Sequence, residues 1–314
     1  MEHLVVGVDA GGSYTRALVA DASGNRVSDA RASGANPISR GLAEMETALT
    51  EALRPVLSAV DPGRVRHGVV AMAGNESVGE GRVASSVEDV WRGVGLACPY
   101  DVVSDVAGAF AAGTCAEDGV VVVAGTGAVA GLVRGGRLVR VVDGYGWLVG
   151  DDGSAFWLGR EAVKAVLAAL DGRGASTDLV RGVTGALDAP MEPRALTERV
   201  YRKPPLALAE LAPLVSEAAA AGDEVASELV EKAAESLLSA VEALRPAGLR
   251  RAVLAGGVLT SEGPLSGLVR DGVRARFHLV PSVAADGAVG AAALAIRAYG
   301  ADLTPEAHAR LTAG

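Results

Sequence analysis

The chain has 314 residues and a net charge of −9, and 50% of its residues are hydrophobic although only 4% are aromatic. The length suggests two domains, and the acidic balance argues against a general nucleic-acid or anionic-membrane surface. No apolar run is as long as a membrane span and the first residues lack the basic segment of a signal peptide, so we expect a cytoplasmic protein. Cys98 and Cys115 have neither disulfide-framework nor zinc-site spacing.

The first part of the chain predicts strands interleaved with helices. Apolar runs bounded by turn residues indicate strands at 4–9, 14–20, 26–32, 68–73 and 100–104. Apolar residues at helical spacing predict helices over 42–60 and 83–94, the first of which ends at Pro62 and Gly63.

The same plan then starts again, about 115 residues after the first glycine turn. Strands are expected at 119–124, 128–134, 138–142 and 251–255. Helices are expected over 155–170, 206–221, 223–244 and 285–299. The repetition predicts two similar α/β domains.

The first glycine turn carries groups that suit a metal-bound polyphosphate. Asp9 ends the strand before the turn, where its carboxylate can hold a divalent cation. Gly11 and Gly12 let the backbone turn tightly and approach a ligand. Ser13 and Thr15 add hydroxyl groups next to the N–H groups of the turn. The alternative is an ordinary hairpin with a glycine turn.

The second glycine turn has the same design. Thr126 supplies a hydroxyl and Gly127 a free N–H after a run of four valines. The segment from Gly125 also resembles the dinucleotide fingerprint, but that motif needs a helix to begin at the glycines, and the residues here continue as a hairpin. We therefore expect two phosphate-binding hairpins, one in each domain.

Asp105 directly follows the strand at 100–104. Phosphoryl transfer to an alcohol needs a carboxylate that accepts or orients the hydroxyl proton beside the phosphate, and a strand end is a reasonable place for it. The alternative is that Asp105 caps the helix that follows. The residues alone leave both interpretations open.

A third cluster, over 144–154, combines glycines, aromatic rings and paired carboxylates. Carboxylates accept hydrogen bonds from neighbouring hydroxyl groups and rings can cover the apolar face of a sugar, so the loop is typical of a polyol site. The alternative is a turn followed by a helix that Ser154 caps. Gly256 and Gly257 follow another strand and either admit a nucleoside close to the backbone or form a tight strand–helix turn.

With these motifs the chain resembles the BadF/BadG/BcrA/BcrD-type ATPase family, in its N-acetylglucosamine kinase-like branch, within the sugar kinase, Hsp70 and actin superfamily. The segment 9–15 looks like the first phosphate motif of the family and 125–127 like the second. The segment 256–258 looks like its adenosine motif, and 146–154 is similar to its sugar-site loop.

The resemblance implies two ribonuclease H-like domains around a cleft, at 1–110 and 111–285, with a helix in 286–314 that packs back on the first. It also implies a homodimer. Asp105 would be the catalytic base on the sugar 6-hydroxyl, and Asp9 would hold Mg²⁺. The residues implied in sugar binding are Asn36, Gly144, Tyr145, Gly146 and Asp151. Those implied in ATP binding are Gly11, Gly12, Ser13, Thr15, Thr126, Gly127, Gly222, Gly256 and Gly257.

We predict from this resemblance an ATP-dependent kinase that phosphorylates D-glucosamine. Asp143, Asp151 and Asp152 would attract a free ammonium at C2, and the alternative substrate is N-acetylglucosamine. An ATPase activator of a dehydratase would need cysteines beyond the second glycine turn, and both cysteines precede it. A sugar-responsive transcription regulator would need a helix-turn-helix before the first strand, and Asp9 lies too near the start for one.

Overall fold

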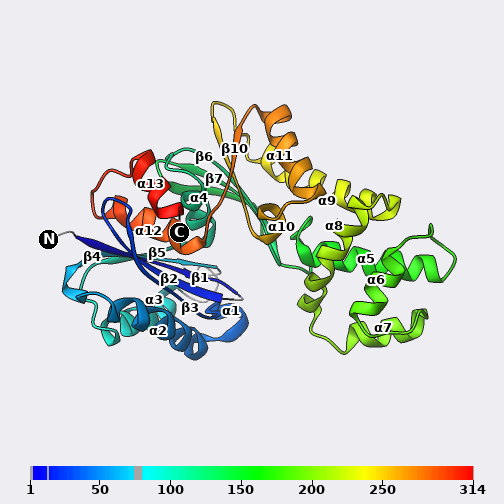
Figure 1. Cartoon of the computed structure of the whole chain (residues 1–314), viewed down its shortest axis with the longest axis horizontal. Helices are drawn as coiled ribbons and strands as arrows, with labels where there is room; N and C mark the ends of the chain where they lie inside the picture. The colour runs from blue at the N-terminus through cyan, green and yellow to red at the C-terminus, as the bar shows by residue number, and fades with distance from the viewer. Residues whose placement is uncertain (1–2, 13, 74–79, 314) are drawn as a thin grey trace. The chain divides into compact units, whose positions relative to one another are not determined.

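The computed structural model describes residues 3–12, 14–73 and 80–313, which form two compact units (Figure 1). Unit 1 contains Met1–Asp118, Val133–Leu138 and Ala284–Gly314, and unit 2 contains Gly119–Leu132 and Val139–Val283. Ser13, one of the predicted ATP-binding residues, lies outside the described residues.

The first sheet has the strand order β3-β2-β1-β4-β5. Its strands are β1 (Leu4–Ala10), β2 (Tyr14–Asp21), β3 (Arg26–Ser33), β4 (Val65–Met72) and β5 (Tyr100–Ser104). β2 is antiparallel to both β1 and β3, whereas β1, β4 and β5 are parallel. Because parallel strands end at the same edge of a sheet, Asp9 and Asp105 come to one edge of unit 1.

Helices cover both faces of this sheet, with α2 and α3 on one side of the strands and α12 and α13 on the other (Figure 1). α2 (Leu42–Ser58) packs in one core cluster with Leu4 and Val6, while α12 (Gly287–Ala298) packs in another with Val5. The backbones approach closely at Gly7, where a methyl group would lie 2.2 Å from the N atom of Ala292. The other helices of unit 1 are α1 (Pro37–Arg40), η1 (Pro62–Arg64), α3 (Glu80–Gly93), α4 (Asp105–Gly113) and α13 (Pro305–Thr312).

The second sheet repeats the plan of the first, with the order β10-β9-β6-β7-β8. Its strands are β6 (Gly119–Ala124), β7 (Ala128–Arg134), β8 (Arg137–Asp143), β9 (Arg251–Ala255) and β10 (Val280–Val283). Val120 and Val122 of β6 lie in one core cluster with helix residues such as Leu237. The matching strand orders confirm the predicted α/β class with two ribonuclease H-like units.

The helices of unit 2 are α5 (Ala155–Leu170), α6 (Leu179–Ala186), α7 (Pro193–Tyr201), η2 (Pro205–Leu211), α8 (Ala212–Ala220), α9 (Glu224–Ala243), α10 (Gly257–Thr260) and α11 (Pro264–Phe277). The prediction of one helix over 206–221 was wrong. Pro205 begins the 3-10 helix η2 and Pro213 lies in the first turn of α8, where proline removes an N–H donor and favours a new helix start. Among the described residues, no helix is both long and apolar enough to cross a membrane.

Candidate active site

Asp9 lies in a group of charged residues at the edge of the unit 1 sheet. The register of β1 and β2 pairs it with Arg16, whose Nη1 lies 3.9 Å from Asp9 Oδ2. The Nε of Arg16 lies 2.9 Å from Oδ2 of Asp286, which caps α12 by accepting from the N–H of Ala288. A methyl group on Gly287 would lie 2.4 Å from Asp9 Oδ2, so the start of α12 lies directly against this carboxylate.

The surroundings of Asp9 disfavour its charged form. Burial, followed by repulsion from Asp286 and Asp105, raises the pKa of Asp9 to about 7, although Arg16 lowers it. A divalent cation would offset this concentration of negative charge, so Asp9 fits the role of a Mg²⁺ ligand. No three His, Cys, Asp or Glu among the described residues are grouped to hold a metal ion. Mg²⁺ usually keeps several waters and substrate phosphates as ligands, so a site with one protein carboxylate is compatible with its coordination preference.

Asp105 is the first residue of α4, but it does not cap the helix. The N-cap is Ser104, whose hydroxyl accepts from the N–H of Val106 at 3.3 Å. The alternative interpretation of Asp105 as a helix cap was therefore wrong. Burial raises the pKa of Asp105, while hydrogen bonds with Val106 and Ser104 lower it in part. A carboxylate with a raised pKa is suited to accepting a proton.

The other predicted residues of unit 1 surround the first glycine turn. The N–H of Gly11 donates to the carbonyl oxygen of Tyr14 at 3.1 Å, and a methyl group on Gly12 would meet nothing within 4 Å. Asn36 is half-buried and immediately precedes α1. Thr15 is fully buried, and its hydroxyl has no hydrogen-bond partner among the described residues. Its side chain is thus an internal polar group, whereas Gly12 is open to a ligand.

In unit 2, the turn from Gly125 to Gly127 joins β6 to β7 and is attached to α5. The carbonyl oxygen of Gly125 accepts from the N–H of Ala155 at 2.8 Å, and that of Thr126 accepts from the N–H of Phe156 at 3.3 Å. A strand follows the turn, so the structure agrees with the rejection of a dinucleotide fingerprint. These bonds fix the turn to the first residues of a helix.

Asp151 connects the predicted sugar loop to this turn. Its Oδ1 accepts from the N–H of Gly146 at 3.2 Å, and a methyl group on Gly127 would lie 2.5 Å from its Oδ2. Oδ1 of Asp143 in turn accepts from the N–H of Asp151 at 2.9 Å. Burial raises the pKa of Asp151; the bond from Gly146 opposes this rise and Asp143 adds to it. The structure therefore brings Gly127, Gly146 and Asp151 together.

The outer part of the sugar loop is open. Gly144 has a φ of 79°, and a methyl group there would lie 3.0 Å from Cγ2 of Val129, so glycine is needed on both counts. Tyr145 is 74% exposed, and Leu148 and Val149 beside it are exposed as well. Apolar side chains exposed in a loop of this kind are available to a ligand.

The predicted nucleotide glycines of unit 2 fall into two places. Gly256 packs on the start of the predicted phosphate turn, because a methyl group on it would lie 2.4 Å from the carbonyl oxygen of Ala124. Gly257 begins α10, and a methyl group there would meet nothing within 4 Å. Gly222 lies in the turn between α8 and α9 with a φ of 92°, and its N–H donates to the carbonyl of Ala219 within that turn.

The sequence reasoning missed Arg16 and Asp286 as neighbours of Asp9. The hairpin register offered a signal for Arg16, since a short turn places it opposite Asp9 on β2. The Asp-Gly-Ala start of the last long helix offered one for Asp286, because Asp is a preferred N-cap.

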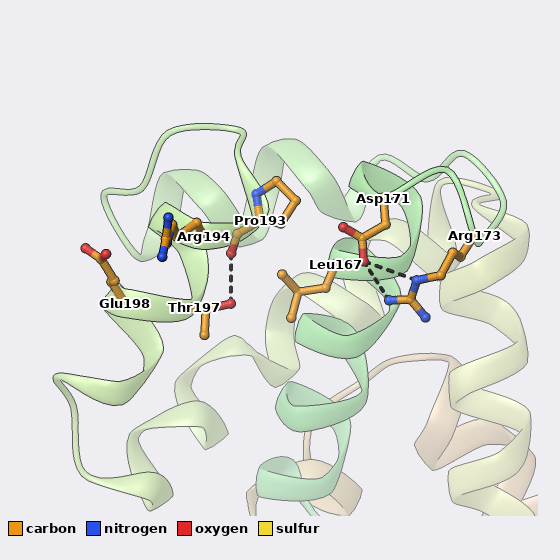
Figure 2. A pocket seen from close by; sticks show the side chains of 7 residues that line it. All are labelled: Leu167, Asp171, Arg173, Pro193, Arg194, Thr197 and Glu198. Carbon is orange, nitrogen blue, oxygen red and sulfur yellow. Dashed lines mark hydrogen bonds and ion pairs between the residues drawn. The ribbon is translucent and has the colours of Figure 1, made fainter.

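A cavity of about 480 Å³ lies elsewhere in unit 2, at the C-terminal end of α5 (Figure 2). Its lining comes from α5, the turn after it, and α7, namely Leu167, Asp171, Arg173, Pro193, Arg194, Thr197 and Glu198. Two of its polar groups already have partners, since Arg173 bonds to Asp171 and the Thr197 hydroxyl donates to the Pro193 carbonyl (Figure 2). No predicted site residue lines it, so we do not assign the candidate active site to this cavity.

Comparison with known proteins identifies the family. A profile of the BadF/BadG/BcrA/BcrD ATPase family matches residues 6–295. The N-acetylmuramic acid/N-acetylglucosamine kinase of Clostridium acetobutylicum is 27% identical over 243 residues, covering 76% of this chain and 78% of that protein. Glucosamine kinase GspK of Vibrio cholerae is 26% identical over 260 residues, covering 81% and 84%. The crystal structure of a candidate N-acetylglucosamine kinase from Chromobacterium violaceum matches with a TM-score of 0.75 at 26% identity, covering 94% of this chain and 99% of that one. The chain belongs to the BadF/BadG/BcrA/BcrD ATPase family.

Proposed function

We propose that this protein is an ATP-dependent amino-sugar kinase that transfers the γ-phosphate of Mg-ATP to the 6-hydroxyl of D-glucosamine. The observation that carries the proposal is the pair of Asp9 and Asp105 at one edge of the unit 1 sheet, each with a pKa raised chiefly by burial. Membership of an ATPase family supports the use of ATP. The proposal includes a homodimer that acts in the cytoplasm.

In this mechanism Asp105 accepts the proton of the 6-hydroxyl while that oxygen attacks the γ-phosphorus. The bond from the γ-phosphorus to the oxygen bridging the β- and γ-phosphates breaks, ADP leaves, and Asp105 ends the step protonated. Thr126 and Gly127 hold phosphate oxygens through a hydroxyl and backbone N–H groups. Asp9 would hold Mg²⁺, which would supply positive charge to the phosphates. The rest of the rate enhancement is positioning of the two substrates.

The choice of glucosamine rests on charge. Asp143, Asp151 and Asp152 place three carboxylates in the predicted sugar loop, and a free ammonium at C2 is attracted to carboxylates while an acetamido group is not. The relatives support an amino sugar but differ in which one, since one is named a glucosamine kinase and another an N-acetylmuramic acid/N-acetylglucosamine kinase. N-acetylglucosamine is therefore the second candidate.

The test is a coupled ADP-release assay with Mg-ATP and a panel of glucosamine, N-acetylglucosamine, glucose and mannosamine. We expect turnover with glucosamine well above turnover with its acetylated form. Preference for N-acetylglucosamine would contradict the charge argument but keep the kinase. Absence of turnover with all four sugars would contradict the amino-sugar kinase itself.

A further inference from the structure

The bond from Asp151 to Asp143 connects the predicted sugar loop to the phosphate turn. We propose that Asp143 is a positioning residue for this reaction: through the N–H of Asp151 it keeps the Asp151 carboxylate on the turn that ends at Gly127. The expected effect on kinetics rests on the proposed function. The structural link between the predicted sugar loop and the turn that ends at Gly127 does not depend on that function.

Asp143 closes the sugar loop from one end. It is the last residue of β8 and has a φ of 64°, so the chain turns there, and its carboxylate reaches across the loop to Asp151. Its Oδ1 accepts from the N–H of Asp151 at 2.9 Å. A methyl group on Gly150 would lie 2.4 Å from the same oxygen. The glycine at 150 thus leaves room for a carboxylate that reaches the backbone of the next residue.

Asp151 passes this restraint to the phosphate turn. Its own φ is 62°, a conformation that residues other than glycine keep only where the surroundings hold it. Its carboxylate accepts from the N–H of Gly146, lies against Gly127, and accepts a further hydrogen bond from the backbone of Ala128, which offsets part of the rise in pKa that burial causes. Asp151 therefore donates a hydrogen bond to Asp143 through its N–H and contacts both loops with its side chain.

The turn from Gly125 to Gly127 is also held by α5, because the N–H groups of Ala155 and Phe156 donate to its carbonyl oxygens. If the carboxylate of Asp151 moves, the Gly127 side of the turn loses its support while the α5 side keeps it. The carbonyl oxygen of Thr126 is bonded to α5, and the next residue, Gly127, lies against Asp151. A loss of Asp143 should therefore alter the position of the phosphate-binding groups without unfolding unit 2.

The charge of Asp143 and its hydrogen bond can be separated by substitution. Asp143→Asn keeps an acceptor oxygen and removes the charge, whereas Asp143→Ala removes both. Asp143→Gly also removes both and accepts a positive φ without strain, so it covers the case in which the alanine variant folds poorly. Asp188→Ala is the matched control, because Asp188 also has a positive φ, 48°, and its side chain is 96% exposed.

Two readouts are needed. The first is hydrogen–deuterium exchange of the ligand-free protein over residues 125–128 and 143–151, which requires no knowledge of the substrate. The second is kcat and KM for glucosamine and for N-acetylglucosamine. Wild type, the three Asp143 variants and the control are measured together.

We expect Asp143→Ala and Asp143→Gly to exchange faster in both segments and to lose about tenfold in kcat on whichever sugar wild type uses, the size expected for one hydrogen bond to a charged acceptor. Asp143→Asn keeps the acceptor oxygen and should keep the exchange of wild type in both segments, and the control should match wild type in exchange and in kcat. Unchanged exchange at 125–128 in the alanine and glycine variants would overturn the proposal. Exchange as fast in Asp143→Asn as in Asp143→Ala would overturn it too, because the charge and not the hydrogen bond would then hold the loop. If wild type phosphorylates neither sugar, the proposed function fails, and the exchange comparison alone decides this link.

Discussion

Unit 1 and unit 2 share one strand order, yet they hold their predicted site residues by different means. In unit 1, Asp9 and Asp105 are carboxylates that burial makes difficult to ionise. In unit 2, the predicted phosphate turn carries no charged residue, and backbone hydrogen bonds and close glycine contacts fix its position. The same strand order therefore places buried carboxylates at the predicted site of unit 1 and an uncharged, closely packed turn in unit 2. Substitutions of Asp9 and Asp105 should depend on pH, and substitutions of the glycines in the unit 2 turn should depend on the size of the added side chain.

The largest effect is expected at Asp105. Asp105→Asn keeps the shape of the side chain but cannot take the proton of the 6-hydroxyl, so kcat should fall by about 10³-fold. The Tm should not fall, because an amide is less costly to bury than a carboxylate. The coupled ADP-release assay and a thermal melt measure the two quantities. Turnover close to wild type in Asp105→Asn would contradict the role of Asp105 as the proton acceptor.

A smaller effect is expected from Asp9 on the stability of the ligand-free protein. Its pKa is about 7 in the folded state against an ordinary value of 3.8, so between these pH values the folded state keeps a proton that the unfolded state has lost. Stability therefore falls as the pH rises through this interval, and the full loss is present above it. Asp9→Asn is neutral at every pH and should raise the free energy of unfolding at pH 8 by on the order of 2 kcal/mol.

The measurement for Asp9 is a series of thermal melts between pH 4 and pH 8. The gain of Asp9→Asn over wild type should shrink toward pH 4, where wild-type Asp9 is itself neutral. Asp29→Asn is the control, since Asp29 is an exposed strand carboxylate for which we expect little change at any pH. A gain that is the same at both ends of the series would show that burial of charge is not its cause.

The smallest effect is expected in unit 2, from Gly127→Ala. The added methyl group would lie 2.5 Å from a carboxylate oxygen of Asp151, and that side chain is itself held by Gly146, so we expect a loss of about 1 kcal/mol. Gly185→Ala in α6 is the matched control, because its methyl group would meet nothing within 4 Å. Melts at two pH values should show the same loss for Gly127→Ala at both. Equal stability of the two alanine variants would contradict the role of shape.

The strands with continuous apolar runs were predicted well. The bounds at 119–124 and 251–255 coincide with β6 and β9, because a strand that is buried on both faces has an unbroken run of apolar residues that turn residues delimit. The bounds at 100–104 also coincide with β5, although no residue of that strand is fully buried. The short strand β10 and the helix α11 were missed. β10 is four residues long with a proline, and α11 carries three arginines among its apolar residues, so neither gives a clear period.

The sequence shows the residue types of a candidate site but not the conformation of its loops. Glycine turns after apolar strands are the reason to expect phosphate-binding turns, and the strand end is the reason to expect a proton acceptor at Asp105. The bond from Asp151 to Asp143 was not predictable, because both residues have a positive φ that only the folded loop imposes. The roles of the site residues in binding sugar and ATP stay predictions.

The order of the segments in unit 1 has a consequence for the growing polypeptide on the ribosome. α12 belongs to unit 1 but follows all of unit 2 in the chain, and it covers the face of the first sheet that contains Val5. Until the ribosome has made residues 284–298, that face lacks its helix, and Asp9 lacks both Asp286 and the backbone of Gly287. Unit 1 therefore exposes apolar surface throughout the synthesis of unit 2, which is the period when a nascent chain of this kind most needs a chaperone.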